Sequence, residues 1–118
     1  MSPTRPNNSF PRANRLHGRT NFLAVITGRA SKRLRGRWCE LVVAQTGESE
    51  SQTEFGISVS RKAGNAVRRN RLKRIIREHL RTHKGSWPAN KMVVIRIKWT
   101  VDDEAGLLAE LEDMLVTL

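Results

Sequence analysis

Several features that define other protein classes are missing from this sequence. It has one cysteine in 118 residues, which excludes an internal disulfide and the paired-cysteine spacing of a zinc knuckle. No stretch approaches the roughly 20 consecutive apolar residues that a membrane span needs, and no apolar signal-peptide core opens the chain. We therefore expect a cytoplasmic protein. The apolar neighbours of Cys39 favour a small buried side chain over a nucleophile.

Acidic residues are also scarce relative to basic ones. The chain has 11 Asp and Glu against 22 Lys and Arg, which gives a formal net charge of +11. Residues 61–84 contain ten basic and one acidic side chain, whereas residues 85–118 contain three and six. A positive field this concentrated repels itself unless a polyanion neutralises it. We therefore expect a nucleic-acid partner that binds mainly through residues 61–84.

Length and patterning predict one small domain. A chain of 118 residues with 38% apolar content can form one compact core and is too short for two. Residues 1–15 contain three of the four prolines and almost no apolar periodicity, so we expect a flexible basic tail there and a domain over 16–118. The apolar pattern then predicts a short helix from Thr20 to Gly28, a weak edge strand near 30–34 and a strand over 38–45.

The second half of the chain alternates between strand and helix patterns. Over 55–60, the apolar residues Phe55, Ile57 and Val59 should face a core, and the small polar residues between them are free to face a ligand. A strand is expected over 92–99, with Trp99 on its apolar face. A last helix should follow a capping box formed by Thr100 and Asp103. These elements predict the α+β class, with a small sheet packed against helices.

The basic helix, expected from an Asn65 cap to about Lys84, has two opposite faces. Its apolar residues recur at helical spacing and should bind the helix to the sheet: Leu72, Ile75, Ile76 and Leu80. The opposite side is polar and basic: Asn70, Lys73, Arg74, Arg77, Arg81 and Lys84, flanked by Arg69 and Arg71. Because a guanidinium can meet two phosphate oxygens at once, this side suits an RNA backbone. Only Glu78 is near enough in the sequence to relieve these like charges.

The string FGISVSRKAGNAVRRNRLKRIIREHLR, residues 55–81, closely resembles the signature of the protein subunit of bacterial ribonuclease P. The resemblance covers about 100 residues from Leu16 onward, with the strand at 92–97 in the family's order. It implies a mixed four-stranded sheet in the order α-β-β-β-α-β-α, with a left-handed βαβ crossover. It also implies an accessory subunit that binds a catalytic RNA and the 5′ leader of precursor tRNA and so promotes 5′ maturation of tRNA. The hydrolysis and its Mg²⁺ would belong to the RNA, and no obligate protein partner is implied.

The resemblance also assigns residues to the two RNA partners. Those expected to face the catalytic RNA are Arg68, Arg69, Asn70, Arg71, Lys73, Arg74 and Arg77. Those expected along the leader path are Phe22, Ser58, Ser60, Arg61 and Lys62. Ile26 stands where the family often has a second aromatic, and Arg96 stands where the last strand commonly carries alanine. Leader contact should therefore depend on charge more than on stacking.

The chain offers little for chemistry of its own. His79 and His83 lie one helical turn apart, which can suit zinc, but no glutamate stands between them and the sequence offers no third ligand. We therefore expect no catalytic residue and no metal site. One alternative is a structural RNA-binding protein such as a ribosomal component, which would need only the charge and the basic helix. The other is a protein nuclease, which would need a general base or metal cluster that the sequence lacks.

Overall fold

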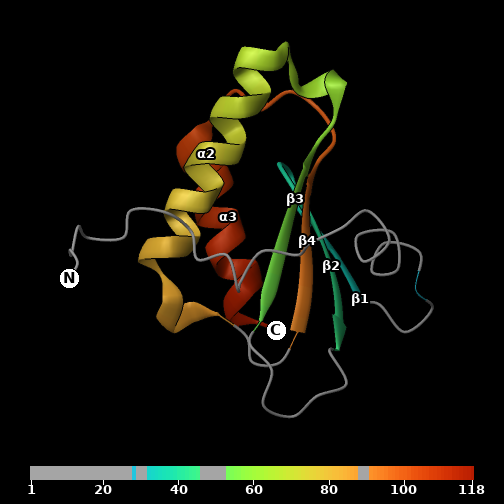
Figure 1. Ribbon diagram of the computed structural model, residues 1–118, viewed down its shortest axis with the longest axis vertical. Helices are drawn as coiled ribbons and strands as arrows, with labels where there is room; N and C mark the ends of the chain where they lie inside the picture. Colours follow the sequence, from blue (N-terminus) through green and yellow to red (C-terminus); the bar gives the residue numbers. More distant parts are fainter. Residues whose placement is uncertain (1–27, 29–31, 46–52, 88–90) are drawn as a thin grey trace, which may run out of the picture.

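The computed structural model describes a four-stranded sheet with two long helices on one of its faces (Figure 1). The described residues are 28, 32–45, 53–87 and 91–118. The strands are β1 (Lys32–Arg35), β2 (Glu40–Gln45), β3 (Glu54–Val59) and β4 (Lys91–Ile97). The helices are α2 (Ala66–Thr82) and α3 (Glu104–Val116), and two 3-10 turns, η2 (Arg61–Ala63) and η3 (Lys84–Ser86), flank α2. The predicted tail lies outside the described residues, and so does the predicted first helix except for Gly28 at its end.

The sheet is mixed, with the spatial strand order β1-β2-β4-β3. β2 pairs antiparallel with β1 and with β4, whereas β3 pairs parallel with β4, so that Ile57 lies beside Ile95. A parallel pair needs a crossover connection, and α2 supplies it between β3 and β4. The predicted α+β class and the mixed four-stranded sheet are therefore confirmed.

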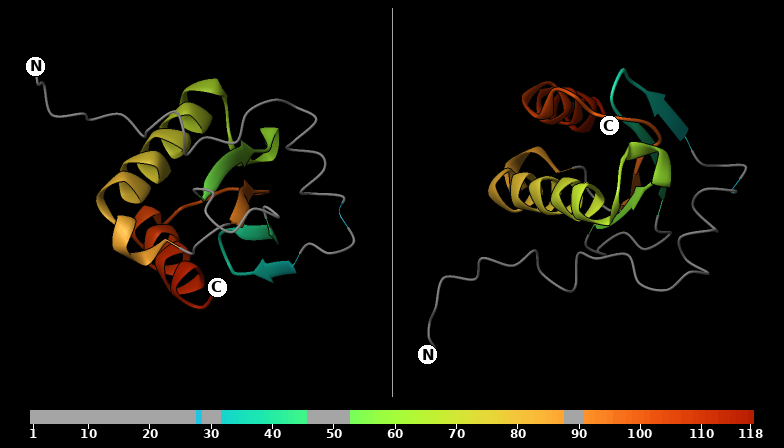
Figure 2. Two further views of the ribbon diagram at one scale, coloured as in Figure 1. Left: turned by 60° about the horizontal axis from the view of Figure 1, so that its bottom comes forward. Right: turned by 90° about the horizontal axis from the view of Figure 1, so that it is seen from above.

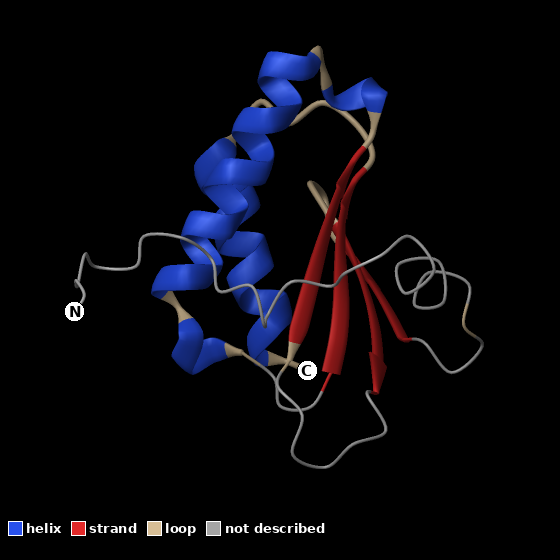
Figure 3. Ribbon diagram, in the orientation of Figure 1, coloured by secondary structure: helices blue, strands red, loops and turns tan. Residues whose placement is uncertain are grey.

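The core lies between the two helices and one face of the sheet. Figures 2 and 3 show the helices as one layer and the strands as another. Each element contributes the residues that its apolar period predicts, such as Leu41 from β2, Ile95 from β4, Leu72 from α2 and Leu111 from α3, all with no exposed surface. Cys39 is also buried in this cluster, as predicted, and burial raises the pKa of its thiol.

The turn that leads into α2 has a specific backbone requirement. Gly64 has a φ of 143°, a conformation that residues with a Cβ rarely adopt. Asn65 follows, and its side-chain oxygen accepts a hydrogen bond from the backbone N–H of Arg68 at 2.9 Å. The predicted cap is therefore confirmed. In the part of the chain that the structure describes, no helix is long and apolar enough to cross a bilayer.

Two predictions near the end of β4 are wrong. Trp99 is 47% exposed because the strand ends at Ile97, and its indole N–H donates to the carbonyl of Arg37 at 2.9 Å. Asp103, not Thr100, caps α3, and its carboxylate accepts from the N–H of Gly106 at 2.9 Å. The capping signal in the sequence was genuine but lay three residues further along the chain.

The side chain of Glu110 in α3 binds the backbone of the hairpin between β1 and β2. Glu110 accepts hydrogen bonds from three successive backbone N–H groups, those of Arg37, Trp38 and Cys39, at 2.7, 2.8 and 2.9 Å. Gly36 lies against the same carboxylate so closely that a Cβ atom would collide with it. The hairpin and the helix are therefore fitted to one another at this point.

Candidate nucleic-acid interface

The rear of α2 is fixed to the core as the sequence predicts. Leu72, Ile76 and Leu80 have no exposed surface, and Ile75 packs at the edge of the same cluster. Burial of three large aliphatic side chains contributes roughly 1.5–3 kcal/mol each, which is enough to hold the orientation of a 17-residue helix. The opposite side of α2 is therefore presented to solvent in a fixed direction.

Four residues on that outward side form what we call the basic face: Asn70, Lys73, Arg74 and Arg77. Asn70, Arg74 and Arg77 are exposed and Lys73 is half-buried. None of the described side chains forms an ion pair with Lys73, Arg74 or Arg77. Three positive charges are thus held along one helix face, and this arrangement favours the binding of a polyanion.

Arg68 and Arg71 do not share this arrangement, which corrects the expectation that only Glu78 is close to the basic residues. Both arginines donate hydrogen bonds to the carboxylate of Glu104 at the start of α3. Arg71 uses Nε and Nη2, each at 2.9 Å, and Arg68 also donates to the carbonyl of Val101. The hydrogen bonds from Arg71 and Arg68 hold the pKa of Glu104 at about 2. Two guanidinium nitrogens of Arg71, Nε and Nη2, are therefore already hydrogen-bonded within the chain, although the side chain remains 48% exposed.

A shallow hollow opens beside the basic face. It has a volume of about 460 Å³ and is lined by Val67, Asn70, Arg71 and Arg74. Val67, in the first turn of α2, is 79% exposed. Arg69 is half-buried, and its Nε has no hydrogen-bond partner among the described residues. An apolar side chain among guanidinium and amide groups can contact a sugar or base while its neighbours contact phosphates.

The far end of α2 contributes less free charge than predicted. Arg81 pairs with Glu78 and is only 24% exposed. The Lys84 ammonium lies 6.0 Å from the centre of the Trp87 ring, beyond the end of the helix. The free positive charge is therefore concentrated in the middle of α2.

The predicted leader residues of β3 and η2 lie together. Phe55 faces the core, so strand alternation places Ser58 on the opposite face of the sheet, in register with Arg96 of β4. The Ser60 hydroxyl accepts from the N–H of Lys62 at 3.2 Å and so caps η2. Arg61 and Lys62 are exposed. Phe22, the remaining predicted leader residue, lies outside the described residues.

Sequence reasoning missed the role of Glu40 on this second sheet face. Its carboxylate is 3% exposed and has Arg35, Arg96 and Lys98 within 2.9, 3.2 and 3.3 Å, with Arg33 at 3.7 Å. Burial alone would raise the pKa of Glu40, but the hydrogen bonds from Arg35 and Lys98 outweigh it and lower the pKa. The signal was a lone acid in an apolar strand, but its partners follow only from the strand register.

Comparisons with known proteins agree on one family. The family described as Ribonuclease P matches residues 10–118. The Ribonuclease P protein component of Desulforapulum autotrophicum is 36% identical over 87 residues, which cover 74% of this chain and 71% of that protein. The ribonuclease P protein of Thermotoga maritima superposes with a TM-score of 0.75 at 29% identity, covering 88% of this chain and 96% of that one. The Staphylococcus aureus protein gives 0.76 at 26% identity, covering 88% and 94%.

Proposed function

Since this chain belongs to the ribonuclease P protein family, we propose that it binds the RNA subunit of ribonuclease P and the 5′ leader of precursor tRNA, and thereby promotes removal of the leader. The observation that carries the proposal is the basic face of α2. Its rear is buried, and Lys73, Arg74 and Arg77 are directed away from the core without a carboxylate partner among the described residues. Phosphate contacts of this kind fix position and orientation without reading sequence, as docking onto a structured RNA requires.

The residues proposed to contact the RNA subunit differ in how directly they can bind it. Arg74 and Arg77 are exposed and form no ion pair with any residue that the structure describes, so they can form bidentate contacts with phosphate without breaking a described ion pair. Arg71 lines the hollow beside them but is already oriented by Glu104. We therefore assign the strongest contacts to Lys73, Arg74 and Arg77, and a positioning role to the pair of Arg71 with Glu104.

The leader contact uses the other side of the molecule. Ser58 and Ser60 are small and polar, and Arg61 and Lys62 supply exposed charge next to them. A single-stranded leader of variable sequence can follow such a surface because charge and small polar groups do not select particular bases. The basic groups around Glu40 extend the positive charge along the sheet.

The hydrolysis itself is assigned to the RNA subunit. Magnesium prefers oxygen ligands, and the carboxylates closest to the basic face, Glu78 and Glu104, are already hydrogen-bonded to arginines. These residues do not fit a magnesium site, so we assign the Mg²⁺ of the reaction to the RNA and its phosphates. We place the reaction in the cytoplasm, where a bacterium makes precursor tRNA.

Reconstitution tests the proposal. The full chain is mixed with a bacterial ribonuclease P RNA at low magnesium, and cleavage of precursor tRNA is followed with and without the protein. We expect the protein to stimulate cleavage, and a Lys73→Ala, Arg74→Ala, Arg77→Ala triple variant to lose most of that stimulation. Arg81→Ala is the matched control because its guanidinium already pairs with Glu78. A folded wild-type chain that gives no stimulation would contradict the proposal.

A further inference from the structure

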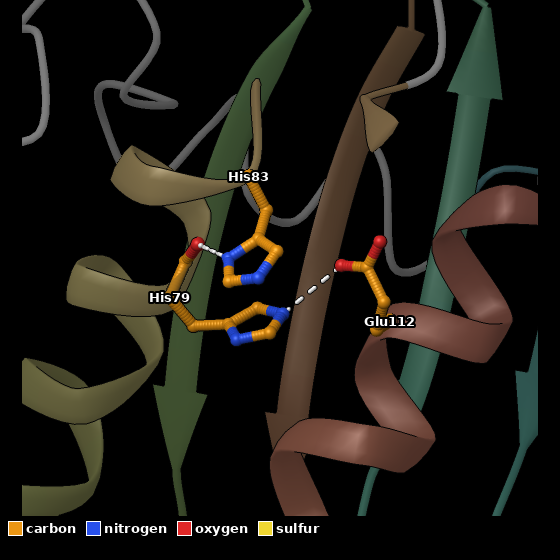
Figure 4. Close-up of side chains that lie close together, drawn as sticks. All are labelled: His79, His83 and Glu112. Carbon is orange, nitrogen blue, oxygen red and sulfur yellow. Dashed lines mark hydrogen bonds and ion pairs between the residues drawn. The ribbon is translucent and has the colours of Figure 1, made fainter. Parts of the chain in front are cut away.

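Two imidazoles and a carboxylate converge at the C-terminal ends of α2 and α3 (Figure 4). Nε2 of His79 lies 3.0 Å from Oε1 of Glu112, and the rings of His79 and His83 are stacked with their centres 4.0 Å apart. One ligand-type atom from each of the three residues lies within 4.8 Å of the others. The sequence supplied only the histidine pair, because Glu112 comes from the neighbouring helix.

The hydrogen bonds of His83 prepare one of its nitrogens for a ligand role. Its Nδ1 lies 2.8 Å from the backbone carbonyl of His79, which can only accept a hydrogen bond, and 2.9 Å from the hydroxyl of Thr82. Because the Thr82 hydroxyl directs its own proton to the backbone carbonyls one turn back, Nδ1 is the donor in both contacts and carries the proton. Nε2 then keeps its lone pair, and Figure 4 shows this nitrogen on the edge of the ring away from the His79 carbonyl, next to the imidazole of His79. An N–H bonded to a backbone carbonyl is the usual support of a metal-ligating imidazole.

The distances suit a small transition-metal ion after a local adjustment. Zinc binds imidazole nitrogen and carboxylate oxygen at roughly 2.0–2.2 Å, which places two ligands of a tetrahedron about 3.3 Å apart. His79 and Glu112 are already near that separation. His83 is exposed, so a small rotation of its side chain can complete the set. The His79 side chain is 11% exposed and that of Glu112 is 27% exposed, so the site is partly shielded from water.

We infer that His79, His83 and Glu112 form a three-ligand site for a zinc-class divalent ion that joins α2 to α3. The donor set excludes magnesium as the preferred ion because imidazole favours zinc, copper, nickel and cobalt. The ion takes the place of the proton between Nε2 of His79 and Oε1 of Glu112, and that proton passes to solvent. His79 then binds as a neutral imidazole with its other ring proton on Nδ1, and the fourth position is left to water. Glu104 with Arg68 and Arg71 already joins the same two helices at their other ends.

Titration of the metal-stripped full chain with Co²⁺ tests the site, because the ligand-field bands of cobalt report the number and type of ligands. We expect one equivalent to bind with nitrogen and oxygen ligands, and Zn²⁺ to displace it. His83→Gln and Glu112→Gln should each weaken binding by more than the roughly 10–100-fold that loss of an outer-shell partner costs. His17→Gln is the matched control, since it removes the remaining histidine and should leave the affinity unchanged.

Thermal unfolding supplies a second readout that is independent of RNA cleavage. Zn²⁺ should raise the melting temperature of the wild type as its concentration increases, and should not raise that of His83→Gln. His83 is exposed, so this variant keeps the fold even if Glu112→Gln does not. Equal Co²⁺ affinity in the wild type and His83→Gln, or no binding by the folded wild type, would overturn the site. Neither result would bear on RNA binding.

Discussion

Glu104 forms a bidentate ion pair with Arg71, in which Nε and Nη2 of the guanidinium each lie 2.9 Å from one carboxylate oxygen. The pair connects the start of α3 to the first half of α2, next to the basic face. It stabilises the packing of the two helices and sets the direction of the guanidinium. It also places a negative charge close to the surface proposed to bind RNA.

Replacing Glu104 with glutamine should therefore lower the stability of the fold while raising the affinity for RNA. The hydrogen bonds that Glu104 accepts from Arg68 and Arg71 join the two helices, so losing their charge should lower the melting temperature by a few degrees. RNA affinity at low salt should rise, because a carboxylate beside the basic face is gone. Circular dichroism melts and fluorescence anisotropy measure the two effects. Glu78→Gln, which breaks an exposed pair within α2, is the control; an equal loss of stability there would contradict the special role of Glu104.

The same carboxylate predicts a pH dependence. Its pKa in the folded protein is about 2, against an ordinary value of 4.5. Because the folded-state pKa of Glu104 is lower than its ordinary value, the ionised carboxylate stabilises the folded protein. This contribution is fully present above pH 4.5 and is lost as the pH falls toward 2 and the carboxylate becomes protonated. The difference in unfolding free energy between the wild type and Glu104→Gln should shrink over this window in denaturant titrations. A difference that stays constant down to pH 2 would show that Glu104 is not the titrating group.

Salt dependence should identify the arginines that contact phosphate. Replacing Arg74 and Arg77 with alanine should flatten the plot of log affinity against log salt concentration by roughly 0.7–0.9 for each lost contact. Arg81→Ala should leave the slope unchanged because that guanidinium is already paired. Filter binding to the RNA subunit over a range of salt concentrations measures the slope. An identical slope for the Arg74, Arg77 double variant and the wild type would place the RNA elsewhere.

Leader contact should appear in the Michaelis constant and not in assembly. The double variant Arg61→Ala, Lys62→Ala loses two charge contacts of roughly 0.5–1 kcal/mol each, which raises the constant about fivefold to thirtyfold. A precursor whose leader is too short to reach the protein should show no such change. Phe22→Ala should behave in the same way if its ring stacks on a leader base. Loss of assembly in Phe22→Ala would instead make that residue part of the core.

The hydrogen bonds from the hairpin to Glu110 should contribute strongly to the free energy of unfolding. Glu110→Ala leaves three backbone N–H groups without their acceptor, which should cost about 2–4 kcal/mol. Glu110→Gln keeps an accepting oxygen and should cost less. Urea titrations measure both variants, with Asp113→Ala on the exposed side of α3 as the control. A loss below that of the control would mean that water replaces the carboxylate.

The sequence predicted those features that depend on near neighbours in the chain. The two-residue period of β3, the helical period of Leu72, Ile76 and Leu80, and the Asn65 cap all act within one element, and all are confirmed. Trp99 was misplaced because an alternating pattern does not show where a strand ends. The basic character of α2 was likewise visible in the sequence.

Contacts between elements were not predictable in the same way. The pairing of Glu104 with Arg71 and that of Glu112 with His79 each span 33 residues. They exist because α3 packs beside α2 in one register, which the core fixes and the sequence does not display. The four basic groups around Glu40 depend in the same manner on the alignment of β1, β2 and β4. The sequence therefore revealed the charges, and the fold determined which of them are available.

Because Gly36 lies so close to Glu110, the residue at either position limits which residues the other position can carry. A methyl group at position 36 would displace the carboxylate and leave the hairpin amides bare. A shorter acid at position 110 would make room but could not reach the amides. Among descendants of this gene, the two sites should therefore be inherited as a pair, and a change at one should survive only where the hairpin has been rebuilt around it.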